Sequence, residues 1–291
     1  MHALEWGRRG NRRVVVCAHG YSGNARDFDF LARELSSFAR VVCPDVAGRG
    51  ESEWLASSLA YHFPQFLADF RSLLVRIGAR EVDWIGTSMG GLLGMLLASQ
   101  PSSPVRSLVM NDVGAFVPLD ALRRIAANLR APARFATLAE IEAHIRHTHR
   151  DWGDIDEAQW AHLVRHGARR VDGGWRLHYD PRIALLAQPV PFAPGLYFWD
   201  AWYRVRCPVL LVRGERSGVL PAAVAEAMIE AKPRTRLVEI AGAGHAPALM
   251  SAAEIEAVRD FVQDPAPREE RRSFHAMMAA HEDRLGERTR G

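Results

Sequence analysis

A serine between two glycines, in the pentapeptide Gly86-Thr87-Ser88-Met89-Gly90, has the G-x-S-x-G pattern of a nucleophile turn. A short apolar run at 82–85 precedes it, and an apolar segment with helical character begins at Met89. A serine between a strand and a helix lies on a tight turn that exposes its hydroxyl. The glycines remove side chains that would collide across such a turn. We therefore predict that Ser88 is a nucleophile.

Two backbone amides are candidates to stabilise the negative oxygen that forms when such a serine attacks a carbonyl group. The N–H of Met89 lies in the first helical turn, where it has no acceptor within the helix. The N–H of Tyr21 lies in the loop after another apolar run, and Gly20 lets that loop approach closely. We predict that Tyr21 and Met89 form the oxyanion hole, and that His19 fixes the loop rather than acting as a base.

His245 is the predicted general base. It ends the sequence Gly242-Ala243-Gly244-His245, which follows the last strand-like run and precedes the last helical pattern. An imidazole titrates near neutrality and can take and return a proton. A second group of histidines, His144, His147 and His149, does not fall on one helical face. We therefore expect no metal site there, and the predicted chemistry needs no cofactor.

The elements that must hold these residues follow from the hydrophobic pattern. Apolar runs alternate with segments in which apolar residues recur every three or four positions, which is typical of a parallel sheet with crossover helices. We predict strands at 13–18, 41–43, 82–85, 105–110, 208–213 and 236–240. We predict helices at 27–38, 66–77, 89–99, 221–231 and 251–262.

The alternation stops between residues 115 and 206, where aromatic residues are dense and no buried parallel strand is evident. A structureless loop of that length is uncommon in a compact domain. We predict a helical cap at 115–206, with a hairpin arm at 175–179, inserted into a core formed by 1–114 and 207–263. The charged tail at 264–291 is expected to be mobile and to carry a helix at 274–285.

Composition limits the partners of the chain. The 37 basic and 34 acidic residues give a net charge of +3 over 291 residues, and no nucleic-acid motif is present, so no nucleic-acid partner is expected. No apolar stretch is long enough to span a bilayer, and the N-terminus lacks a signal-peptide pattern, which predicts no membrane partner and a cytoplasmic location. Three cysteines (Cys17, Cys43 and Cys207) predict buried thiols rather than disulfides.

Five motifs together carry a resemblance to a known family. They are HGYSGN at 19–24, PDVAGRGES at 44–52, GTSMGG at 86–91, NDVG at 111–114 and GAGHAP at 242–247. In this order, over roughly residues 4 to 262, they resemble the α/β-hydrolase fold superfamily, in particular its lid-bearing esterase-like members. The resemblance implies a mostly parallel sheet flanked by helices. It also implies a helical cap after the fourth parallel strand, a pocket under the cap, and a Ser–Asp–His order along the chain.

The acid of this trio departs from the pattern that the resemblance implies. In the family the loop after the penultimate strand resembles G-x-x-S-D, whereas here Gly218 stands where the aspartate is expected. Three alternatives remain open. The first is that Asp112, after the neighbouring strand, orients His245, although Asp112 could instead only cap its own turn. The second is that Glu215 bends inward. The third is that the acid is missing. Loss of the acid typically lowers kcat by a factor on the order of 10⁴.

These residues predict a serine hydrolase, in particular a carboxylesterase. We expect it to cleave a small, partly apolar ester through an acyl-enzyme on Ser88, with a small ester-like molecule as its partner. One alternative is hydrolysis of a carbon–carbon bond in a diketone on the same scaffold. Another is a binding or sensor protein whose catalysis is weakened because Gly218 replaces the acid. The sequence makes no prediction of the oligomeric state.

Overall fold

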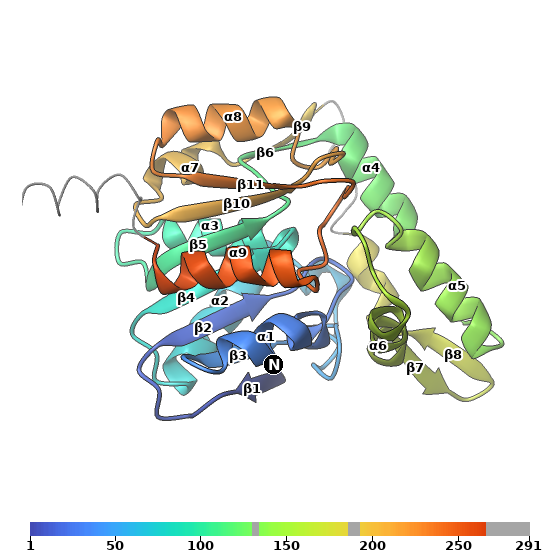
Figure 1. Cartoon of the computed structure of the whole chain (residues 1–291). Coiled ribbons are helices and arrows are strands. Elements are labelled where there is room, and N and C mark those ends of the chain that lie inside the picture. The colour runs from blue at the N-terminus through green and yellow to red at the C-terminus, as the bar shows by residue number, and fades with distance from the viewer. Residues whose placement is uncertain (130–133, 186–192, 266–291) are drawn as a thin grey trace, which may run out of the picture.

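A seven-stranded sheet forms the centre of the molecule in the computed structural model, which describes residues 1–129, 134–185 and 193–265 (Figure 1). The strand order is β1-β3-β2-β4-β5-β10-β11, and every pairing is parallel except that of β1 with β3. The strands are β1 (Ala3–Trp6), β2 (Val14–Ala18), β3 (Arg40–Pro44), β4 (Val82–Thr87), β5 (Val105–Asn111), β10 (Val209–Gly214) and β11 (Arg236–Ile240). The predicted mostly parallel sheet is confirmed.

Helices cover both faces of this sheet. One face packs against α1 (Asp29–Leu35) and α9 (Ala252–Gln263), and the other against α2 (Phe63–Arg76), α3 (Met89–Ala98) and α8 (Ala222–Ala231). Short 3-10 turns lie at η1 (Ala25–Phe28) and η2 (Ser58–Ala60). The central strands read as continuous apolar runs because neither of their faces meets water, and β2 is buried along its whole length.

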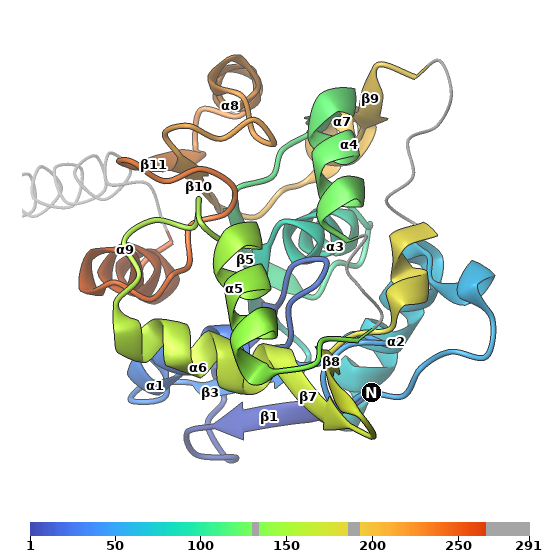
Figure 2. The ribbon, with the colours of Figure 1, turned by 90° about the vertical axis from the view of Figure 1, so that its right-hand side faces the viewer.

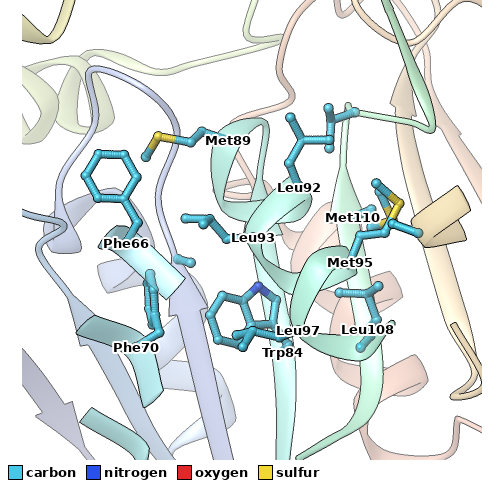
Figure 3. Close-up of a cluster of buried hydrophobic side chains, with 14 of the residues drawn as sticks. Phe66, Phe70, Trp84, Met89, Leu92, Leu93, Met95, Leu97, Leu108 and Met110 are labelled. Atoms are coloured by element: carbon cyan, nitrogen blue, oxygen red, sulfur yellow. The ribbon is translucent and has the colours of Figure 1, made fainter. Parts of the chain in front are cut away.

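The core around α3 fixes the start of that helix. Figure 3 shows side chains of α3 between Phe66 and Phe70 of α2 and residues of β4 and β5. The rings of Phe70 and Trp84 lie 4.8 Å apart, and Trp84 donates a hydrogen bond of 2.9 Å from Nε1 to the carbonyl oxygen of Gly90. This contact ties β4 to the first turn of α3, on either side of Ser88.

The segment at 115–206 lies beside the edge of the sheet where the parallel strands end (Figure 2). It contains four helices and two antiparallel strand pairs: β6 (Phe116–Pro118), α4 (Leu119–Asn128), α5 (Leu138–Thr148), α6 (Glu157–Gly167), β7 (Ala168–Val171), β8 (Gly174–Leu177), η3 (Pro181–Leu185), β9 (Gly195–Tyr197) and α7 (Trp199–Arg204), counted over the described part of the chain. We call it the inserted segment. It follows β5, the fourth parallel strand, as predicted, and Trp202 of α7 is fully buried in the main core.

Several elements differ from the predictions. The edge strand β1 was not predicted, and the expected helix at 27–38 is a 3-10 turn followed by the shorter α1. The expected arm at 175–179 is β8, which starts one residue earlier and pairs with β7. The expected tail helix at 274–285 lies outside the described residues.

The structure also bears on the predictions that the cysteines are buried thiols and that no segment spans a bilayer. All three cysteines are free; Cys17 and Cys43 are buried as predicted, whereas Cys207 is partly exposed. Within the described ranges, none of the helices has both the length and the apolar character needed to cross a bilayer.

Candidate active site

Ser88 occupies a strained turn between β4 and α3. Its φ of 51° and ψ of −114° lie in a region that residues other than glycine rarely adopt. A Cβ atom at Gly86 would lie 2.2 Å from the carbonyl oxygen of Gly90, and one at Gly90 would lie 2.0 Å from the carbonyl oxygen of Ala18. Both positions therefore admit only glycine, which is the physical reason for the G-x-S-x-G pattern.

A chain of hydrogen bonds joins Ser88, His245 and Asp112. Nε2 of His245 lies 3.0 Å from Oγ of Ser88, and Nδ1 lies 2.7 Å from Oδ2 of Asp112. Because an ionised carboxylate only accepts, the imidazole proton belongs on Nδ1 and Nε2 is left to accept the serine proton. The Asp112 side chain is fully buried and that of His245 is 24% exposed. This is the geometry of a nucleophile, a base and an orienting acid.

Asp112 is anchored between β5 and β10. Its backbone N–H donates to the carbonyl oxygen of Val212 at 2.7 Å. Its Oδ1 accepts the N–H of Gly214 at 2.9 Å, and its Oδ2 also accepts the hydroxyl of Ser217 at 2.6 Å. The sequence left open which acid, if any, lies beside His245. In the structure this residue is Asp112.

The other acid candidates lie elsewhere. Oε2 of Glu215 accepts the backbone N–H of Gly242 at 2.7 Å on the protein surface, so this carboxylate is engaged away from His245. Gly218 contributes no carboxylate, and the carboxylate that lies 2.7 Å from Nδ1 of His245 is that of Asp112. Sequence reasoning missed Ser217, although it occupies the serine of the G-x-x-S-D pattern; here its hydroxyl holds Asp112.

The two predicted oxyanion donors lie on either side of Ser88. The Tyr21 loop approaches so closely that a Cβ atom at Gly20 would lie 3.8 Å from Cβ of Ser88. Within the described part of the chain, neither the Tyr21 N–H nor the Met89 N–H donates to a protein acceptor. Both amides are thus available to a bound oxygen, as an oxyanion hole requires.

His19 stands under this loop as a structural hydrogen-bonding residue. Its Nδ1–H donates to the carbonyl oxygen of Gly20 at 2.7 Å, and its Nε2 accepts the N–H of Val46 at 2.9 Å. Burial lowers the pKa of His19 to about 4, so the ring is neutral near pH 7. With both nitrogens engaged, His19 fixes the loop and is not available as a base.

A cavity of about 140 Å³ opens onto Ser88 and His245. The loops that follow β2 and β4 line one side, and α4, α5 and α6 of the inserted segment line the other. Its apolar lining includes Ile125, Leu129, Ile145, Trp152, Leu163 and Leu177. Its polar lining includes Asp27, Asn128, His144, Thr148, His149 and Tyr179. Such a mixed lining suits a small molecule with apolar carbon and a few hydrogen-bonding groups.

His149 gives the cavity a neutral imidazole. Burial lowers its pKa to about 4, and Nδ1 lies 2.9 Å from the carbonyl oxygen of Ile145. A carbonyl oxygen only accepts, so the proton belongs on Nδ1 and Nε2 is a hydrogen-bond acceptor. The ring stands edge-on to Trp152, with the two centroids 4.1 Å apart. Because His149 lines the cavity, its Nε2 is a candidate acceptor for a hydroxyl group of a ligand.

Asp27 is the unusual carboxyl group of the cavity. Burial raises its pKa to about 7, the nearby charges of Asp45 and Asp29 add to the rise, and the backbone N–H of Asn24 opposes it. That N–H donates to Oδ2 of Asp27 at 3.2 Å. Both protonation states of Asp27 are therefore populated near neutrality.

One group of side chains has the composition of a metal site. Across residues 1–129, 134–185 and 193–265, the ligand atoms of Asp29, His162 and His166 lie within 4.8 Å of one another, whereas the histidines of α5 form no such group. Arg26 donates to Oδ2 of Asp29 at 3.0 Å. Because this guanidinium already balances the carboxylate, the group is explained as a polar contact between α1 and α6.

Comparisons with known proteins identify relatives of the chain. The model of the alpha/beta hydrolase family matches residues 15–258. The chain is 41% identical over 265 residues to a 3-hydroxybutyrate-oligomer hydrolase of Cupriavidus necator, covering 88% of this chain and 90% of the relative. It is 30% identical to Esterase Rv0045c of Mycobacterium tuberculosis, over 74% and 70% of the two chains. A solved alpha/beta hydrolase from Novosphingobium aromaticivorans superposes with a TM-score of 0.80 at 31% identity, over 90% and 93%.

Proposed function

The chain belongs to the alpha/beta hydrolase family, and we propose that it is a serine esterase that cleaves small hydroxy-acid esters, such as oligomers of 3-hydroxybutyrate. The observation that carries this proposal is the hydrogen-bonded chain of Ser88, His245 and Asp112 at a cavity of mixed polarity. The substrate class is supported by the 41% identical relative, because a hydroxy acid forms oligomers through ester bonds and the match spans most of both chains.

Acylation follows from the positions of the polar atoms. His245 accepts the hydroxyl proton of Ser88 through Nε2 while Oγ attacks the ester carbonyl carbon. The negative charge on the carbonyl oxygen is stabilised by the N–H groups of Tyr21 and Met89. Asp112 holds the imidazole in the correct tautomer and stabilises the imidazolium. His245 then gives its proton to the leaving alcohol, which departs as the acyl-enzyme forms.

Deacylation repeats these steps with water as the nucleophile. His245 removes a proton from water as the water oxygen attacks the acyl-enzyme carbonyl, and then returns that proton to Oγ of Ser88. The acid is released and the serine is regenerated. The neutral His149 in the cavity wall is placed to accept a hydrogen bond from a hydroxyl on the substrate.

The two alternatives predict different behaviour. A binding or sensor protein was suggested by Gly218, but Asp112 lies where an orienting acid is needed. Hydrolysis of a carbon–carbon bond predicts turnover of a diketone in preference to an ester. No described contact favours that chemistry over ester cleavage.

Turnover of a defined ester tests the proposal directly. We expect the wild-type protein to hydrolyse the 3-hydroxybutyrate dimer and trimer, and p-nitrophenyl butyrate as a generic ester. Ser88→Ala should lower kcat on both by a factor on the order of 10⁶, as loss of a nucleophile does in other serine hydrolases.

Covalent labelling and a second variant supply the controls. A fluorophosphonate should label the wild type at Ser88 and leave Ser88→Ala unlabelled. Ser72→Ala is the matched control, since Ser72 is exposed on α2 and lies outside the residues that line the cavity, and it should keep most of the activity. Equal rates for wild type and Ser88→Ala would refute the proposal, and faster cleavage of a diketone would favour the carbon–carbon alternative.

A further inference from the structure

Arg49 is a fully buried arginine beneath the oxyanion loop. It lies in the PDVAGRGES motif, between Gly48 and Gly50, and its relative exposure is 0%. Its backbone is held in place because Gly48 accepts a hydrogen bond from the N–H of Asp180, and the N–H of Gly50 donates to His178. Burial of a charged group is costly unless it is paired, so a buried arginine needs a physical explanation.

The Arg49 side chain contacts both residues that supply the oxyanion donors. Nε donates to the carbonyl oxygen of Tyr21 at 3.0 Å, and Nη2 lies 3.8 Å from Sδ of Met89. Nη1 donates to the carbonyl oxygen of Ala47 at 2.8 Å. Figure 3 shows the Met89 side chain extending from the start of α3 toward Phe66, and the guanidinium lies 5.2 Å from the centre of the Phe66 ring.

The positive charge of Arg49 is not neutralised by a direct carboxylate partner. Within the described residues its hydrogen bonds reach two carbonyl oxygens and one sulfur, and its guanidinium also lies 5.3 Å and 5.8 Å from the rings of Tyr21 and Tyr61. Asp180, which acts on Arg49 only from a distance, accepts the Tyr61 hydroxyl at 2.6 Å and is paired with Arg182. Dipoles and rings therefore hold a nearly uncompensated cation.

We propose that Arg49 positions the oxyanion hole through Tyr21 and Met89 and adds positive electrostatic potential there, and so favours the negative charge that forms on the substrate in the transition state. This inference rests on the proposed function. A fixed cation held against the two residues that carry the donor amides stabilises charge that develops during reaction more than it stabilises the neutral ester. Arg49 is thus a positioning residue, since its contacts are to Tyr21 and Met89 and not to the substrate.

The test compares three variants that separate charge from packing. Arg49→Met replaces the side chain by an apolar one, Arg49→Gln keeps hydrogen bonding without charge, and Arg49→Lys keeps the charge. For each variant, kcat and KM are measured on p-nitrophenyl butyrate. The inhibition constant of butylboronic acid, which mimics the tetrahedral transition state on Ser88, is measured alongside, and circular dichroism reports folding.

Loss of the charge should act on the transition state. We expect Arg49→Met and Arg49→Gln to lower kcat by roughly 10- to 100-fold, less than loss of an oxyanion donor costs, with KM changed by less than about threefold. Boronate binding should weaken by a similar factor. Arg49→Lys should recover most of both losses. If Arg49→Met does not fold, the comparison of Arg49→Lys with Arg49→Gln decides between charge and packing.

Two results would overturn the inference. One is a folded neutral variant with kcat within twofold of the wild type. The other is an equal loss in the lysine and neutral variants, which would assign Arg49 to packing alone. Either result, obtained with an active wild type that is labelled at Ser88, leaves the proposed function standing. A wild type that is neither labelled nor active removes the proposed function and this inference together.

Discussion

Two regions of the molecule meet at the cavity, and they are built on different principles. Where β2, β4 and β5 end, backbone geometry dictates the residue: Gly90 in the first turn of α3 leaves no room for a side chain, and Ser88 has a positive φ. In the inserted segment, side chains from helices and their ends line the cavity, such as Leu163 of α6 and His149 at the end of α5. The first region fixes which atoms react, and the second decides which molecule fits.

The difference teaches where substitutions should act. A change in the loops should damage folding or the catalytic step itself, because the backbone there has no alternative arrangement. A change in the inserted segment should alter the preference among substrates while kcat on a generic ester persists. The three predictions that follow test this contrast, from the largest expected effect to the smallest.

Gly90→Ala should have the largest effect. Its Cβ would lie 2.0 Å from the carbonyl oxygen of Ala18, an atom of β2 that cannot move freely. We expect the free energy of unfolding to fall by about 3 kcal/mol or more, together with loss of esterase activity, since strain in a packed core is costly. Urea denaturation measures this. Gly10→Ala is the control, because a Cβ there meets nothing within 4 Å and should change stability by less than about 0.5 kcal/mol. Equal stability of the two variants would contradict the account of the turn.

His149→Phe should alter substrate preference. The neutral imidazole offers Nε2 to a hydroxyl of the substrate, and loss of one such hydrogen bond is worth about 1 kcal/mol. We expect a roughly fivefold to tenfold rise in KM for p-nitrophenyl 3-hydroxybutyrate and a change of less than about twofold for p-nitrophenyl butyrate. Steady-state kinetics measure both, and His147→Phe, an exposed residue of α5, is the control. Equal effects on the two esters would remove His149 from substrate recognition.

Asp27→Asn should change how stability depends on pH. The pKa of Asp27 rises from its ordinary value of 3.8 to about 7 in the folded protein, so the folded state binds more protons between these pH values. Its contribution to stability is fully present below about pH 4 and is lost as the pH rises through 7. As the pH rises from 5 to 8, the variant should therefore gain stability relative to the wild type.

Urea denaturation of both proteins at pH 5 and pH 8 measures that gain. His19 and His149 are buried and have pKa values of about 4. Their effect on the pH dependence of stability is the same in the two proteins, so it cancels when the two free energies of unfolding are subtracted. Parallel stability curves for wild type and Asp27→Asn would show that Asp27 titrates as an ordinary carboxyl group.

The contrast between the regions also separates what the sequence predicts from what it does not. The strands and the roles of Ser88 and His245 follow from local signals: continuous apolar runs and glycines at positions that exclude a Cβ. The edge strand β1 was missed because three of its four residues are only partly buried and Glu5 is exposed, so no apolar run marks it. The two small strand pairs of the inserted segment depend on its packing, and only part of one was expected.

Asp112 is the clearest case of a role that the sequence alone does not predict. Asp112 lies 133 positions before His245 in the chain and reaches it because β5 is the neighbour of β10 in the sheet. The motif alone left the capping role of Asp112 and its orienting role equally open. The supporting hydroxyl of Ser217 reaches Asp112 only through the tertiary arrangement of the two loops, which no local sequence pattern marks.

Asp112→Asn, compared with Glu215→Gln, tests the central claim most directly. The account assigns the orientation of His245 to Asp112, so Asp112→Asn should lower kcat on p-nitrophenyl butyrate by a factor on the order of 10⁴, with the fold retained. Glu215→Gln should keep a rate close to that of the wild type, because Glu215 is engaged with the backbone of Gly242. A near-wild-type rate for Asp112→Asn, or a collapse of activity in Glu215→Gln, would contradict the account.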